Sequence, residues 1–285
     1  MSLAADADID RVDAARLAAL FRQRYGSAVP PAGTPWSAAI DAILDHRSAR
    51  AYLPKALPPG TLELLVAAAQ SAPTSSNLQA WSVVAVADPE RKARLAKLAG
   101  PNAQINEAPL FLVWIADLAR ARAIAHQHDT PGDGLDYIES FLLAALDAAL
   151  AAQNAVVAAD SLGLGSCYIG AIRNHPEAVA TELGLPPETV AVFGLTVGHP
   201  DPVRASAVKP RLPQSSVLHH ERYGATARPD DLAAYNAALR QFQAGQQMPP
   251  IDWTEQVSRR IGTTPALKGR EQLSGVLRRL GFKLL

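Results

Sequence analysis

The sequence predicts an α+β fold, or a three-layer arrangement in which helices cover a sheet. Helical segments alternate irregularly with short runs of β-branched and aromatic residues, which differs from a regular strand–helix series. The glycine-rich strand–turn–helix sequence of a dinucleotide-binding Rossmann unit is absent. With 285 residues, of which 48% are hydrophobic, the chain can form a sizeable core.

The first 35 residues are interpreted as an N-terminal extension. Apolar side chains recur at near-helical spacing over residues 8–24 and predict an amphipathic helix. Three prolines and two glycines between residues 26 and 35 then interrupt the pattern. Residues 36–285 are therefore expected to form the main domain, which ends in a helical tail.

The main domain is expected to begin with a helix that starts near Thr34 or Ser37 and ends at residues 46–50. A second helix is predicted over Thr61–Gln70, with Thr61 as its capping residue. Buried strands are predicted over Trp81–Ala87, Leu110–Ala116 and Val190–Val197. Further helices are expected over Arg91–Ala99, Asp230–Gln246 and Glu271–Leu280.

A long helix over Ser140–Leu162 has almost no polar face, and alanine fills many of its positions. A helix that is apolar nearly all round has to be covered on every side. In a chain of this size, the core can cover one side and a second subunit the other. The pattern therefore predicts a contact with a second subunit.

Composition excludes several classes of protein. Basic and acidic residues each total 27, so the chain has no formal net charge, whereas nucleic-acid binders usually carry a basic excess. The single cysteine excludes an intrachain disulfide framework. Acidic residues between positions 6 and 13 stand where a secretory signal needs an apolar segment, and no apolar run has membrane-helix length. We expect a cytoplasmic protein that binds neither nucleic acid nor membrane.

Two short basic groups are candidates for binding an anion. The first is His46-Arg47-Ser48-Ala49-Arg50 at a predicted helix end, and the second is Lys209-Pro210-Arg211. Guanidinium groups are permanently charged and form bidentate hydrogen bonds with phosphate. Each group taken alone also fits an ordinary solvated helix end or surface loop.

The segment Gly163–Gly170 follows the apolar helix and could approach a flat ligand closely, because its glycines permit tight turns. It also fits a helix end that leads into a strand. Cys167 is interpreted as a buried filler rather than a nucleophile. The His126/His128 and His219/His220 pairs lack the spacing of a metal site, and no Gly-x-Ser-x-Gly sequence indicates a hydrolase.

Taken together, these segments resemble the nitroreductase superfamily, and within it the NADPH-preferring major nitroreductase and flavin reductase branch. The matching segments, in order, are His46–Arg50, Ala72–Trp81, Ala152–Ala155, Ser161–Gly165, Tyr168–Gly170 with Arg173-Asn174, and Lys209–Pro213. Their order and spacing agree from about residue 37 to the C-terminus. Residues 36–285 are thus interpreted as a nitroreductase-like FMN-binding domain.

The resemblance implies a homodimer with a mixed, mostly antiparallel sheet and two FMN sites at the subunit interface. Arg47, Lys209 and Arg211 would hold the FMN phosphate, with His46 and Ser48 beside them, and Arg50 would reach the pyrimidine edge of the flavin. The remaining implied site residues are Thr74, Ser75, Ser76 and Gln79 from the partner subunit, Asn102, and Tyr168, Ile169 and Gly170 along the flavin ring.

The resemblance also implies an NAD(P)H-dependent oxidoreductase that reduces nitroaromatics, quinones or free flavin by a ping-pong mechanism. NADPH is the expected donor, and Arg259 and Arg260 are candidates for meeting its extra phosphate. FMN carries the chemistry, so no catalytic side chain is assigned. The alternatives are a flavin-destroying or dehalogenating enzyme of the same fold, a non-catalytic flavin-binding protein, and a hydrolase or metal enzyme.

Overall fold

The structure is a computed structural model that describes residues 14–26, 30–31, 33–100, 102–224 and 228–285. Residues 8–13 of the first predicted helix lie outside the described residues. Two compact units can be distinguished. One contains residues 1–47 and 206–263, and the other contains residues 48–205 and 264–285.

The second unit contains a four-stranded sheet. Its strands are β1 (Trp81–Val86), β2 (Leu110–Asp117), β3 (Gly165–Ile169) and β4 (Thr189–Gly198), in the order β1-β2-β4-β3. The three predicted strands are confirmed. β3 confirms the alternative in which a helix end leads into a strand, because pairing with β4 extends the glycine-containing segment that follows the long helix. All three strand pairings are antiparallel, and a parallel contact joins Ser48 and Ser166 as an isolated bridge.

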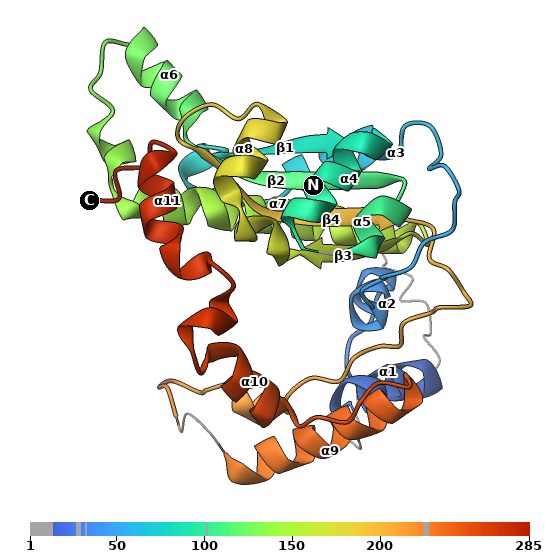
Figure 1. The fold of residues 1–285 in the computed structure, drawn as a ribbon. Helices are drawn as coiled ribbons and strands as arrows, with labels where there is room; N and C mark the ends of the chain where they lie inside the picture. The colour runs from blue at the N-terminus through green and yellow to red at the C-terminus, as the bar shows by residue number, and fades with distance from the viewer. Residues whose placement is uncertain (1–13, 27–29, 32, 101, 225–227) are drawn as a thin grey trace, which may run out of the picture. The chain divides into compact units, whose positions relative to one another are not determined.

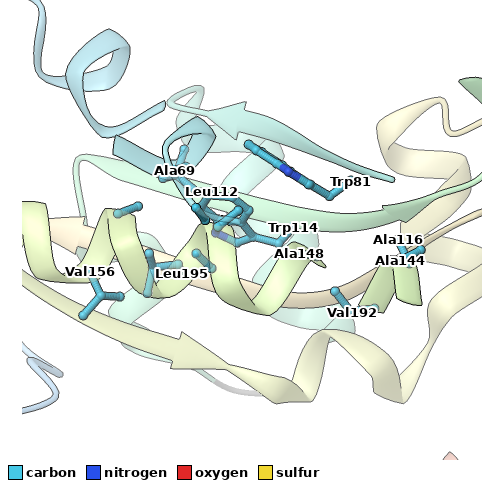
Figure 2. Packing of buried hydrophobic residues seen from close by; sticks show 14 of the residues in the cluster. Ala69, Trp81, Leu112, Trp114, Ala116, Ala144, Ala148, Val156, Val192 and Leu195 are labelled. Carbon is cyan, nitrogen blue, oxygen red and sulfur yellow. The ribbon is translucent and has the colours of Figure 1, made fainter. Parts of the chain in front are cut away.

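Helices cover both faces of this sheet, which confirms the predicted α+β class. Alternate residues of β2 belong to different hydrophobic clusters, as the two-residue period of a strand requires. Leu112 and Trp114 belong to the cluster of α7 (Ile138–Ser161), whereas Phe111 and Val113 join the cluster of α4 (Pro89–Leu98) and α8 (Pro176–Leu183). Figure 1 shows α7 along the sheet, and Figure 2 shows Trp114, Leu195 and Ala148 packed together.

Helix α7 corresponds to the predicted long apolar helix. Its alanine-rich face, including Ala144, Ala148 and Ala152, is fully buried within the chain. On another face, Leu142, Leu146 and Leu150 recur every four residues and are each about half exposed. By length and mean hydropathy α7 could cross a membrane, but the packing of its alanine face on the sheet is that of a core helix.

The other helices of the second unit are α3 (Thr61–Gln70), α5 (Ala103–Glu107), α6 (Ala119–Gln127) and α11 (Leu273–Arg279). The predicted capping role of Thr61 is wrong. Gly60 precedes the helix in a left-handed conformation, and the Thr61 hydroxyl instead donates to the Pro58 carbonyl at 2.7 Å. Asp88, by contrast, caps α4 by accepting from the Arg91 N–H at 2.7 Å.

The first unit contains α1 (Ala14–Tyr25) and α2 (Ala38–Asp45) from the start of the chain, and α9 (Pro229–Gly245) and α10 (Trp253–Ile261) from its later part. Ser37 caps α2, since its hydroxyl accepts from the Ile40 N–H at 3.3 Å. Of the two predicted starts for this helix, Ser37 is therefore the correct one.

Candidate functional site

The two basic groups of the sequence contribute cations to the first unit. His46 ends α2, and Arg47 follows it with an exposed side chain that pairs with Asp45 at 2.7 Å. Lys209 and Arg211 flank the buried Pro210, and both are exposed. The Lys209 ammonium also lies 5.7 Å from the centre of the Phe242 ring.

Arg24 of α1 joins these two segments. Its Nη2 donates to the His46 carbonyl at 2.6 Å, and its Nη1 donates to the Lys209 carbonyl at 3.0 Å. Sequence reasoning missed Arg24, because an arginine on an amphipathic helix resembles any solvated cation. The structure therefore brings together His46, Arg47, Lys209 and Arg211, which belong to segments far apart in the sequence.

In the second unit, residues 48–50 lie beside the start of β3. The Ala49 N–H donates to the Ser166 carbonyl at 2.9 Å, and the Tyr52 hydroxyl donates to the Ala49 carbonyl at 2.7 Å. Arg50 is exposed. Burial raises the pKa of the Cys167 thiol, while the nearby Arg50 charge opposes that rise. Cys167 is thus the buried, unreactive residue that was predicted, and the Arg50 charge acts close to β3.

The end of β3 presents a polar and aromatic edge. The Tyr168 hydroxyl donates to the Gln153 amide oxygen at 3.3 Å, and its ring meets Phe193 edge-on. Burial raises the pKa of Tyr168, so the phenol stays neutral. Ile169 is buried, and Gly170 begins the turn that follows the strand.

The loop Thr74–Gln79 has an unusual backbone. Ser76, Asn77 and Gln79 all have positive φ angles, between 49° and 53°, which non-glycine residues rarely adopt. The buried carboxylate of Asp147 holds this loop by accepting from the N–H of Ser75 at 3.0 Å and of Ala80 at 3.3 Å. Strained backbone that is held in this way is concentrated at functional sites.

Asp147 was also missed as a site residue. The signal for it in the sequence is an acidic side chain within an otherwise apolar helix, which is costly unless the charge has partners.

Asn102 lies at the start of α5. Its amide nitrogen is engaged by the carbonyls of Ala99 and Gly100 at 2.9 and 2.7 Å.

The cations and hydroxyl groups at the predicted site positions are of the kinds that bind FMN. Arg47, Lys209 and Arg211 supply cations of the kind that bind a phosphate dianion. In the part of the chain that the structure describes, the hydroxyls of Thr74 and Ser166 are buried without a hydrogen-bond partner. Trp114 Nε1 and His199 Nε2 are also buried without a partner, but only Thr74 belongs to the strained loop and lines a groove, so its hydroxyl is the one that suits a polar ligand.

The chain belongs to the nitroreductase family. The model of the Nitroreductase family matches residues 43–199, and that of the Nitroreductase family C-terminal domain matches residues 209–285. These matches confirm the resemblance that the motifs indicated.

Similar proteins include the FMN reductase (NADPH) of Bacillus subtilis, which is 42% identical over 185 residues, covering 65% of this chain and 74% of that protein. The NADPH-flavin oxidoreductase of Vibrio harveyi is 34% identical over 224 residues, covering 78% and 90%. The solved structure of NfrA2 from B. megaterium superposes with a TM-score of 0.82 at 37% identity, covering 88% of this chain and 100% of that one.

Proposed function

We propose that this protein binds FMN non-covalently and uses it to pass electrons from NAD(P)H to a flat acceptor such as a nitroaromatic, a quinone or free flavin. The predicted class, an NAD(P)H-dependent flavin oxidoreductase, is supported by the family and by relatives named as FMN reductase and NADPH-flavin oxidoreductase. When bound, FMN supplies a ring that accepts hydride and releases electrons.

The observation that carries the proposal is the gathering of cations around Arg24. Like charges repel at close range, so a cluster of arginines stores unfavourable energy that an anion relieves. Arg47 and Arg211 both act on Arg24 by repulsion. A phosphate dianion is the ligand that suits such a cluster, and Arg47, Lys209 and Arg211, with His46 and Ser48 beside them, are its proposed partners.

For the flavin ring we propose residues of the second unit. Arg50 would offer a fixed charge to the pyrimidine edge, and Tyr168, Ile169 and Gly170 would lie along the ring face. The proposed residues that complete the ring site are Thr74, Ser75, Ser76, Gln79 and Asn102. These groups bind and orient, and none has to transfer a proton. The two substrates bind in turn, with the oxidised nicotinamide leaving before the acceptor enters.

The surface of α7 supports a homodimer. Leu142, Leu146 and Leu150 form an exposed apolar stripe, and beside it a groove of about 370 Å³ is lined by the same leucines and by Thr74 and Ser75. Stripes of this kind are usually covered by a partner. We propose that a second copy covers it, so that each Thr74–Gln79 loop serves the partner's flavin. We also propose a cytoplasmic location.

The test uses the visible spectrum of the purified protein. Bound FMN makes the protein yellow, which separates the proposal from a hydrolase or metal enzyme. Under anaerobic conditions, NADPH should bleach the spectrum, and addition of a nitroaromatic, a quinone or free flavin should restore it. Bound FMN without bleaching would indicate a non-catalytic flavin protein. Bleaching with loss of the flavin or release of halide would favour the same-fold alternatives.

A further inference from the structure

Arg24 lies on a helix that precedes the segments matched by the family models, which begin at residue 43. Its side chain is only 6% exposed, and all three guanidinium nitrogens donate to backbone carbonyls. The Nε atom reaches Leu44 at 3.0 Å, Nη2 reaches His46 at 2.6 Å, and Nη1 reaches Lys209 at 3.0 Å. One buried side chain therefore fixes both the end of α2 and the segment that carries Lys209.

The main chain of α1 adds a fourth link. The Arg24 carbonyl accepts from the Arg211 N–H at 2.7 Å. The Lys209 carbonyl accepts a hydrogen bond from Arg24 Nη1 and another from Arg211 Nη1 at 3.2 Å. Two guanidinium groups therefore share one carbonyl oxygen. The direction of the Arg211 side chain is thus coupled to the position of Arg24.

The charges around Arg24 favour the binding of an anion. The pKa of Arg24 is lowered, first by burial and then by repulsion from Arg211 and, more weakly, from Arg47. Asp45 opposes this effect, but its carboxylate is already shared by Arg16 at 3.4 Å and Arg47 at 2.7 Å. A dianion placed among Arg47 and Arg211 would offset the remaining repulsion.

We propose that Arg24 is a positioning residue for the FMN phosphate, and that α1 is a functional part of the cofactor site rather than an accessory extension. Arg24 holds the backbone of His46 and Lys209, and thereby aims the side chains of Arg47 and Arg211 at the phosphate. This inference rests on the proposed function, in which those side chains bind FMN.

The test compares FMN with riboflavin, which has the same ring but no phosphate. Apoprotein variants are titrated with each flavin, and binding is followed by quenching of flavin fluorescence. Arg24→Ala should weaken FMN binding about tenfold or more and leave riboflavin binding within about twofold of wild type. Arg24→Lys keeps the charge, but its single nitrogen cannot reach the three carbonyls that Nε, Nη1 and Nη2 of arginine contact, so it should also weaken FMN binding selectively. Arg22→Ala, an exposed arginine on the same helix, is the matched control and should change neither affinity.

An equal loss of FMN and riboflavin binding in the Arg24 variants would mean that Arg24 merely supports the fold, and unchanged FMN binding would also overturn the inference. If Arg24→Ala does not fold, as judged by circular dichroism, Arg24→Lys decides by the same comparison. Arg211→Ala separates the two proposals. If Arg211→Ala leaves FMN affinity unchanged, the proposed phosphate site is misplaced. If it weakens FMN and the Arg24 variants do not, only the role of Arg24 fails.

Discussion

Gly165 on β3 faces Ala49 so closely that a Cβ added to the glycine would stand 2.6 Å from the Ala49 Cβ. The same Cβ would stand 2.7 Å from Pro200 Cγ. Real side chains do not approach to this distance, so residue 165 has to be glycine for residues 48–50 to lie against β3. Ser48 and Arg50, both proposed FMN contacts, flank the contact residue Ala49.

Gly165→Ala should therefore destabilise the protein by about 1–3 kcal/mol, because the added methyl overpacks this contact. It should also weaken flavin binding, since the segment carrying Ser48 and Arg50 has to move away from β3. Urea denaturation and flavin titration measure the two effects. Gly134→Ala is the control, because a Cβ at Gly134 meets nothing within 4 Å. If Gly165→Ala matched Gly134→Ala in both measurements, the tight contact would be unimportant.

Much of the fold could be predicted because its signals are local. The strands β1, β2 and β4 are runs of β-branched and aromatic residues, and α7 is long and apolar. β3 could be predicted only as one of two alternatives, because its five residues, Gly165–Ile169, begin with glycine and depend on pairing with β4. Such a segment becomes a strand through tertiary pairing, which outweighs its weak intrinsic preference.

The candidate site could be predicted only in part, for a related reason. Arg47 and Arg211 could be named because they lie in motifs that resemble a known family. The residues that hold those motifs in place, Arg24 and Asp147, act through hydrogen bonds to backbone atoms. Backbone acceptors and donors carry no side-chain signature, so the partners of Arg24 and Asp147 become visible only in three dimensions, although an acid within apolar sequence does mark Asp147 itself.

The role of Asp147 leads to a prediction on stability. The carboxylate is 2% exposed and accepts from the backbone N–H groups of Ser75, in the Thr74–Gln79 loop, and of Ala80, directly after it. Asp147→Asn would place an amide NH₂ against one of these donors. The cost should be about 2 kcal/mol, since a buried donor loses its charged partner. FMN affinity should fall as well, because the strained loop would relax.

Denaturant unfolding and flavin titration of Asp147→Asn provide the measurement. Glu90→Gln removes a charge from a highly exposed position on α4 and should leave both quantities unchanged. A stability equal to wild type in Asp147→Asn would show that the two hydrogen bonds do not hold the loop.

A third prediction concerns the exposed stripe on α7. Leu146→Asp places a charge in the proposed subunit contact, where burying it would cost several kcal/mol. The variant should be a monomer in light scattering after size-exclusion chromatography, and it should retain FMN poorly, since each flavin would lose the partner's loop. Ile124→Asp, at a similarly exposed position on α6, should remain dimeric. A wild-type protein that is itself monomeric would refute the proposed dimer.

The last prediction concerns acid stability near the C-terminus. Hydrogen bonds from Lys283 and then Arg122 hold the pKa of Asp136 below its usual value. The folded state thus favours the ionised carboxylate. The resulting stabilisation is complete above the ordinary aspartate pKa of about 3.9 and is lost as the pH falls through the lower folded-state value. Asp136→Asn should therefore be less stable than wild type at pH 7, and the difference should shrink in acid as the wild-type carboxylate takes up a proton.

Urea midpoints measured from pH 7 down to about pH 3 test this linkage. Asp133→Asn, an exposed change in the same turn, should track wild type throughout. A gap between wild type and Asp136→Asn that stayed constant with pH would mean that the ion pairs with Lys283 and Arg122 do not stabilise the fold.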